Sequence, residues 1–257
     1  MNIVFVNLLK GYSYTVFTKQ IFFKRVHKII LFITIFFLIS GCNNSIRSSK
    51  MSTIQQTTPR LLTLVDYHNP ILRKSASLVL FPLSEQDQQI IKDMKYSIQP
   101  EQLKEANAPW DTAAGMAAPQ WGINKQIFLF SPERNSVDGL EVIINPSYKP
   151  IKDTATGVLQ QDWKWESCFS VPLATGKVKR YTHIKVTYQN ENGETIVREL
   201  HDWPARVWQH ENDHLNGILY DDPRYISAGK SSDKQQFSSK EDVENFYKAK
   251  KEEEEKI

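Results

Sequence analysis

The pattern His210-Glu-Asn-Asp-His214 places the strongest constraint on how this chain can fold. Two histidines four residues apart project from the same face of an α-helix, which has about 3.6 residues per turn, so both imidazoles can reach one cation. Glu211 lies between them and is a candidate catalytic base. The alternative is a polar helix that carries two surface histidines. The surrounding sequence has to decide between a metal site and that alternative.

Local signals support a helix at this position. Asp202 is a candidate N-cap, and Pro204 follows where the first turn tolerates proline. No further Pro or Gly occurs until Gly217. The sequence therefore predicts a helix that is capped by Asp202, has Pro204 at an early position and continues through Ala205–Asn216, where it carries both histidines.

Other segments predict one further helix and several short strands. The apolar spacing after Ser84 predicts a helix over Ser84–Ser97, with Ser84 as its N-cap. Apolar runs bounded by Pro, Gly or Asn predict strands over Gln126–Ser131 and Leu140–Asn145. The alternating segment His183–Gln189 and its partner Thr195–Leu200 predict a hairpin. Together these elements predict an α+β fold in which short antiparallel strands surround the histidine helix.

A catalytic metal usually takes a third protein ligand. The metzincin proteases would place it at position 220, which here is Tyr220. A thermolysin-like downstream glutamate does not fit well either, because the acidic residues that follow His214 are Asp221 and Asp222, with no other before Asp233 in the polar tail. Cys168 is the single cysteine outside the N-terminal 60 residues, so it has no partner there for an internal disulfide. A thiolate with two imidazoles suits zinc or ferrous iron. The alternative is a buried free thiol that packs as a small apolar residue.

Three motifs occur in a characteristic order: residues 115–120 (Gly-Met-Ala-Ala-Pro-Gln), residues 166–170 (Glu-Ser-Cys-Phe-Ser) and residues 209–215 (Gln-His-Glu-Asn-Asp-His-Leu). This combination resembles the peptide deformylases over roughly residues 62–222. The resemblance also includes shorter matches at Asn69-Pro70, Leu72-Arg73, Asn145-Pro146, Val178, Arg180 and Ala205-Arg206. It implies the α+β deformylase fold and hydrolysis of the N-formyl group of N-formylmethionyl peptides or proteins.

The resemblance also implies roles for individual residues. The metal ligands would be Cys168, His210 and His214, and Glu211 would be the general acid and base. Gln120 and the backbone N–H of Phe169 would stabilise the oxyanion, while Gly115 and Met116 would contact the substrate. The metal would be one divalent ion, ferrous iron, which zinc, nickel or cobalt can replace. Glu166 and Arg206 are expected to orient a ligand from outside the site.

Two positions depart from the family pattern. Ala113 and Ser167 stand where the family usually has glycine, and both add atoms beside the site. These departures leave a second hypothesis open, in which a catalytically impaired deformylase-like lipoprotein binds peptide N-termini. A zincin-type endopeptidase is a third hypothesis, for which the sequence lacks a suitable ligand.

The N-terminal segment predicts export. Lys24, Arg25 and Lys28 precede the uncharged apolar run Ile29–Ile39, whose 11 residues are too few to span a bilayer. The sequence that ends at Cys42 resembles the lipoprotein box, which implies signal cleavage before Cys42 and its lipidation. The prediction is an exported, membrane-anchored lipoprotein on the periplasmic or cell-surface side. An uncleaved anchor is the alternative, and a cytoplasmic protein is expected if the segment is not a working signal.

Charge and composition define the remaining regions. The first 41 residues hold five of the 32 basic residues and no acidic residue, so the rest carries 27 basic against 29 acidic groups, a net charge of −2. This balance argues against a nucleic-acid partner. The predicted organisation is a signal peptide (1–41), a polar tether (42–60), a catalytic domain (61–226) and a charged, partly helical C-terminal extension (227–257).

Overall fold

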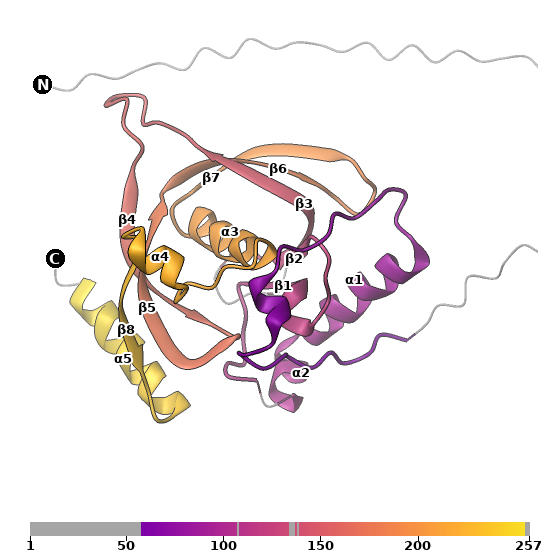
Figure 1. Cartoon of the computed structure of the whole chain (residues 1–257), viewed down its shortest axis with the longest axis horizontal. Helices are drawn as coiled ribbons and strands as arrows, with labels where there is room; N and C mark the ends of the chain where they lie inside the picture. Colours follow the sequence, from indigo (N-terminus) through magenta and orange to yellow (C-terminus); the bar gives the residue numbers. More distant parts are fainter. Residues whose placement is uncertain (1–57, 107, 134–136, 138, 255–257) are drawn as a thin grey trace, which may run out of the picture. The chain divides into compact units, whose positions relative to one another are not determined.

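The computed structural model describes residues 58–106, 108–133, 137 and 139–254. In this part of the chain two antiparallel sheets lie on either side of one helix (Figure 1). The predicted α+β class, with strands around the histidine helix, is therefore confirmed. The predicted signal segment, Cys42 and the tether up to residue 57 lie outside the described residues. Within the described part, no helix combines the length and the apolar character that a membrane crossing requires.

The elements follow one another along the chain in a mixed order. The helices, including two 3-10 turns, are η1 Pro70–Arg73, α1 Glu85–Ser97, α2 Pro100–Glu105, η2 Ala118–Trp121, α3 Asp202–Leu215, α4 Pro223–Ser227 and α5 Lys240–Glu254. The strands are β1 Gly115–Ala117, β2 Ile127–Phe130, β3 Glu141–Pro150, β4 Gln161–Cys168, β5 Val171–Tyr181, β6 His183–Gln189, β7 Thr195–His201 and β8 Ser231–Gln236.

The larger sheet has the strand order β1-β2-β3-β6-β7, and all its pairs are antiparallel. It contains the predicted hairpin, in which His183 of β6 lies opposite His201 of β7. Strand β3 extends five residues beyond its predicted end at Asn145. The register shifts between Ile144 and Ser147, and Asn145 adopts a positive φ of 49°. This bulge lets the strand continue through Asn145-Pro146, although a proline by itself predicts that the strand ends there.

The smaller sheet has the order β4-β5-β8, and its strands were not predicted from the sequence. Strands β4 and β5 form a long hairpin with Glu166 opposite Gly176, and β4 ends at Cys168. Strand β8 comes from the polar C-terminal extension and pairs with β5. The smaller sheet therefore joins the extension to the strand that supplies the candidate thiolate ligand.

Helix α3 lies between the sheets and contacts strands of both (Figure 1). Its Trp208 is fully buried and packs edge-on against Phe128 and Phe130 of β2 and Tyr188 of β6, with ring centroids 5.0 to 5.5 Å apart. Loss of a buried tryptophan side chain typically costs about 3–5 kcal/mol. This packing fixes the rotation of α3 about its axis, so the opposite face of the helix presents the two histidines to the smaller sheet.

The N-terminus of α3 differs from the prediction. Asp202 is the first helical residue and His201 is the N-cap, with no side-chain capping hydrogen bond. Proline is tolerated throughout the first turn, where its missing N–H has no intrahelical partner, so Pro204 does not delay the helix. The predicted C-terminus is accurate, because Asn216 is the C-cap and Gly217 follows with φ +67°.

The ends of the described chain pack on the domain. At one end, the guanidinium and backbone N–H of Arg60 donate to Asp93 of α1, so the last residue of the predicted tether is fixed to a helix. At the other end, α5 confirms the predicted helix in the extension. Its Val243 is only 1% exposed, so α5 is a packed helix and not a fully solvated one.

Candidate active site

The three predicted ligands come together from two elements. Cys168 ends β4, while His210 and His214 lie one turn apart on α3. The sulfur of Cys168 is 3.2 Å from Nε2 of His214, and potential ligand atoms of all three residues lie within 4.8 Å of one another. Burial and neighbouring positive charge hold the pKa of His214 well below its usual range, so its imidazole is neutral and has a lone pair for a metal. A soft sulfur with two nitrogens fits zinc or ferrous iron.

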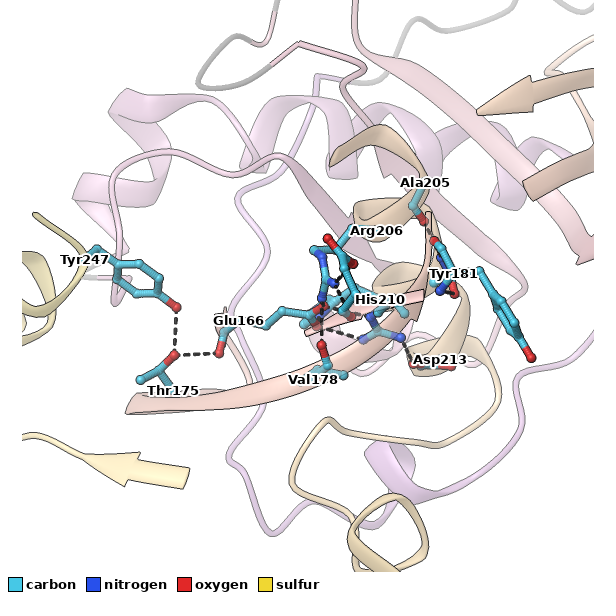
Figure 2. Close-up of polar contacts among 12 residues, drawn as sticks. Glu166, Thr175, Val178, Tyr181, Ala205, Arg206, His210, Asp213 and Tyr247 are labelled. Atoms are coloured by element: carbon cyan, nitrogen blue, oxygen red, sulfur yellow. Dashed lines mark hydrogen bonds and ion pairs between the residues drawn. The ribbon is translucent and has the colours of Figure 1, made fainter. Parts of the chain in front are cut away.

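A buried ion-pair cluster orients His210. Glu166 is 7% exposed and accepts from Nδ1 of His210 at 3.0 Å, which leaves Nε2 of that ring for a metal (Figure 2). Arg180 donates two hydrogen bonds of 2.8 Å to Glu166, and Arg206 donates another of 2.6 Å. Although burial disfavours a charged carboxyl, Arg180 holds the pKa of Glu166 well below its usual range. The expectation that Glu166 and Arg206 orient a ligand is supported, and Arg180 is a partner that sequence reasoning missed.

Glu211 lies beside the three ligands and is 4% exposed. Burial raises the pKa of its carboxyl to about 7, which suits a group that must both take and give a proton near neutral pH. Its Oε2 atom is buried and has no hydrogen-bond partner among the described residues. A buried acceptor without a partner is costly unless a ligand or water meets it. The orphaned oxygen therefore fits a water held next to a metal.

Gly115 of β1 leaves the space that Glu211 occupies. A Cβ atom at position 115 would lie 2.7 Å from both Cγ and Oε1 of Glu211, closer than any van der Waals contact allows. Gly115 also lines the cavity, where its predicted contact with the substrate remains a prediction. Met116, the next residue, is fully buried in the apolar core and is absent from the cavity wall. Because side chains alternate along a strand, a cavity on the side of Gly115 turns Met116 toward the core.

The predicted oxyanion donors lie next to the ligands. The Oε1 atom of Gln120 accepts from the backbone N–H of Ala117 at 2.8 Å, and its Nε2 atom lies 3.7 Å from the sulfur of Cys168. This pairing fixes the amide with its donor end toward the metal ligands. Phe169 follows Cys168 directly and packs edge-on against Trp110, with ring centroids 5.2 Å apart. Both residues line the cavity, as an oxyanion site requires.

These groups surround a cavity of about 730 Å³. Strand β4, helix α3 and the segment 110–115 that leads into β1 supply most of its wall, and α5 supplies Tyr247, Lys250 and Lys251. The departures from the family pattern lie here too. Ala113 is buried at the wall, and the hydroxyl of Ser167 is 2.9 Å from that of Tyr247. The sequence marked Ser167 as unusual, because the family usually has glycine there. No local pattern indicated that its partner is Tyr247, 80 residues away.

Amide hydrolysis with a single metal ion requires three protein ligands, a nearby acid–base group and a pocket for the substrate. The chain supplies all of them around one cavity, so its fold and site define a metal-dependent hydrolase.

Comparison with known proteins identifies the family. The model of the polypeptide deformylase family matches residues 61–228. A peptide deformylase of Limosilactobacillus reuteri is 38% identical over 161 residues, which are 60% of this chain and 84% of that protein. The crystal structure of peptide deformylase from Thermotoga maritima superposes with a TM-score of 0.50 at 31% identity, covering 62% of this chain and 95% of that one. A Met-Ala-Ser-bound class I type b peptide deformylase from Acinetobacter baumannii gives a TM-score of 0.50 at 28% identity, covering 62% and 96%.

The chain belongs to the polypeptide deformylase family. It is a hydrolase that removes the N-formyl group from N-formylmethionyl peptides, as the resemblance implied. No finding favours the hypothesis of an impaired binding protein.

Proposed function

We propose that Cys168, His210 and His214 hold one divalent metal ion and that Glu211 is the general acid and base of deformylation. The bound ion would supply a Lewis acid that lowers the pKa of water and polarises the formyl oxygen. Glu211 accepts the proton of the attacking water and then donates it to the departing amine, so formate and a free N-terminus leave. The amide of Gln120 and the N–H of Phe169 donate to the oxygen that becomes negative in the transition state.

The observation that carries this assignment is the carboxyl of Glu211. It is buried beside the three ligands, its pKa is about 7 and its Oε2 atom has no hydrogen-bond partner among the described residues. The peptide supported by the comparison is short and begins with methionine, because the related Acinetobacter baumannii structure binds Met-Ala-Ser.

The test is formate release from formyl-Met-Ala-Ser by the full chain, purified without oxygen and loaded with iron or nickel. Glu211→Gln keeps the shape of the side chain and removes its acid–base chemistry, so kcat is expected to fall on the order of 10²–10⁴-fold. Metal content, measured by mass spectrometry, should not change. A Glu211→Gln variant with full activity would overturn the role of Glu211, and unaltered protein that binds metal without releasing formate would favour a binding function.

We propose ferrous iron as the native metal, with zinc, nickel and cobalt as replacements. One thiolate and two imidazoles form a ligand set that accepts each of these ions, so metal supply and exchange decide which is bound. Protein purified without oxygen should contain close to one equivalent of iron. Full activity in protein that carries zinc alone from the cell would contradict this proposal.

We propose that the enzyme is exported and anchored by lipid at Cys42. The support is the basic patch before Ile29–Ile39, the short apolar run and the position of Cys42 three residues after its end. Its substrates would then be formylated peptides or proteins that have crossed the membrane. The Cys42→Ser variant should no longer incorporate labelled fatty acid, and its signal peptide should no longer be cleaved. The nearby variant Asn44→Ser should still show both modifications. Fatty-acid labelling of Cys42→Ser equal to that of the unaltered chain would contradict lipid anchoring at this residue.

A further inference from the structure

Helix α5 forms a wall of the catalytic cavity although it lies beyond the residues that match the family. The match ends at residue 228, and α5 spans Lys240–Glu254. Its Tyr247, Lys250 and Lys251 line the cavity that also contains Cys168 and Glu211. Residues three and four positions apart share one face of a helix, so a single face of α5 is turned toward the substrate.

Specific contacts hold this face in place. Phe246 packs edge-on against Trp165 of β4, with ring centroids 4.9 Å apart. The hydroxyl of Tyr247 lies 2.9 Å from that of Ser167. It also lies 2.7 Å from that of Thr175, which donates to the backbone carbonyl of Glu166 (Figure 2). The helix is therefore joined to the strand that ends at the candidate thiolate ligand, and its lysines have a defined position at the cavity.

Three lysines line this cavity. Lys164 of β4 lines it together with Lys250 and Lys251, and Lys164 and Lys251 are exposed. The two carboxyl groups in the wall are buried, and Glu166 already accepts from Arg180, Arg206 and His210. Glu166 is therefore already engaged with these three side chains inside the wall.

The ion pair that Lys250 makes on its own helix does not prevent it from binding a substrate. Its Nζ atom lies 2.7 Å from Glu253, and both side chains are partly solvated, at 34% and 62% exposure. Exposed pairs three residues apart on a helix are weak, so a substrate carboxylate can compete for the ammonium.

We propose that Lys164, Lys250 and Lys251 form a subsite that binds carboxylate groups of the substrate peptide beyond its first residues. The carboxylate is either an Asp or Glu side chain or the C-terminus of a short peptide. The proposal rests on the deformylase activity and adds a preference for acidic substrates, which the lysines of an element outside the family match provide.

The test compares formylated peptides of one length with the full, metal-loaded chain. The peptides are formyl-Met-Ala-Asp-Asp-amide, formyl-Met-Ala-Ser-Ser-amide and formyl-Met-Ala-Lys-Lys-amide, together with the Ser-Ser peptide as a free acid. The KM for the Asp-Asp peptide should be about tenfold below that for the Lys-Lys peptide, with kcat equal within about twofold, and 1 M salt should reduce the gap. A lower KM for the free acid than for its amide identifies the chain end as a second source of the carboxylate.

Two variants locate the effect. The double variant Lys250→Glu with Lys251→Glu should reverse the preference, and Lys164→Glu should reduce it without altering α5. Lys248→Glu makes a charge change of the same kind on the same helix, at an exposed position outside the cavity wall, and should leave the preference intact. Circular dichroism checks that each variant keeps its helices.

Two measurements separate the subsite from the activity. Formate release from the Ser-Ser amide by the unaltered chain tests deformylation itself. Calorimetric binding of the deformylated peptides Met-Ala-Asp-Asp-amide and Met-Ala-Lys-Lys-amide tests the subsite without turnover. Equal affinity for these two peptides, or a reversal in Lys248→Glu as large as that in the double variant, overturns the proposal.

Discussion

Among the residues that the structure describes, two clusters bring histidines together with a potential anionic ligand, and they differ in surroundings more than in spacing. Cys168, His210 and His214 form one, while the β6–β7 hairpin forms the other from His183, Glu199 and His201. In each cluster the potential ligand atoms lie within 4.8 Å of one another. The first is buried among ion pairs and beside a cavity, whereas Glu199 in the second has a side chain that is 53% exposed.

The difference shows which features, besides short distances between ligand atoms, make a cluster a catalytic metal site. In the buried cluster a separate carboxylate, Glu166, holds His210 by the nitrogen that does not face the other ligands. In the exposed cluster the carboxylate of Glu199 bonds to Nε2 of His183, and the rings of His183 and His201 stack with centroids 3.8 Å apart. The candidate ligands of the exposed cluster therefore hydrogen-bond and stack with one another. The supporting hydrogen bonds and the desolvated pocket, more than the spacing, distinguish a catalytic centre.

The largest expected effect comes from removing a ligand of the buried cluster. His214→Ala should reduce the metal content from one equivalent to near zero and the rate of formate release by on the order of 10³-fold or more, because the ion contributes several kcal/mol to transition-state stabilisation. Mass spectrometry and the formate assay measure the two effects. Metal retained at one equivalent in this variant would mean that the exposed cluster, or another site, binds the ion.

The next effect tests the space around Glu211. In Gly115→Ala the new methyl group would meet the Glu211 side chain at 2.7 Å and displace the carboxyl. Misplacement of a catalytic group by about 1 Å can cost on the order of 10²-fold in rate. The metal content should stay at one equivalent, which separates this effect from loss of a ligand. Ala113→Gly changes the same loop by one methyl group without this clash and is the matched control; activity lost equally in both variants would refute the steric explanation.

Removing the support of His210 should have a somewhat smaller effect on activity and a large one on stability. Glu166→Gln leaves Arg180 and Arg206 without their shared carboxylate, so we expect the free energy of unfolding to fall by about 3–5 kcal/mol. Metal affinity should fall about 10–100-fold. Urea denaturation and chelator competition measure these quantities.

The pH dependence of the same variant has a definite sign. The folded-state pKa of Glu166 lies below its unfolded value of about 4.3, so the stabilisation is fully present above that pH. It is lost as pH falls from there through the folded-state pKa. The stability difference between Glu166→Gln and the unaltered chain should therefore shrink in acid, and a difference that grows below pH 4 would exclude the ion pair as its cause.

The smallest effect is expected at the exposed cluster. His201→Ala removes one of the stacked rings but no contact with the cavity, so activity should stay within about twofold and metal content should not change. The change in the free energy of unfolding should be below about 1 kcal/mol, since the site is solvated. A fall in bound metal to a fraction of an equivalent would show that the hairpin is a second site and would remove the contrast between the clusters.

Sequence reasoning selected the candidate ligands, which the structure brings together, because their signals are local or belong to known motifs. The histidine pair needs only the geometry of one helix, and the order of three motifs located Cys168 and Gln120. The hairpin and α1 were predicted from their alternating and helical apolar patterns. The N-cap of α3 is His201, one residue before the predicted cap at Asp202.

The contacts that the sequence did not reveal depend on pairing between distant segments. Glu166 and Arg180 are charged residues of the kind expected on a surface, and only the register of β4 against β5 buries them together. The predicted hairpin did not include His201, because its second strand was expected to end at Leu200; the observed register places His201 opposite His183. Strand β8 is polar throughout, so its role depends on the open edge of β5 rather than on its own pattern.

The position of α5 has a consequence for the newly made protein. A chain emerges from the ribosome in N-to-C order, and domains begin to fold during synthesis. Every proposed metal ligand and catalytic residue precedes α5, so these groups are translated before the helix that closes one side of their cavity. The reactive groups of the nascent enzyme are therefore synthesised before the α5 lysines of the proposed carboxylate subsite. Once α5 has folded against the domain, the open site becomes one that discriminates among its substrates.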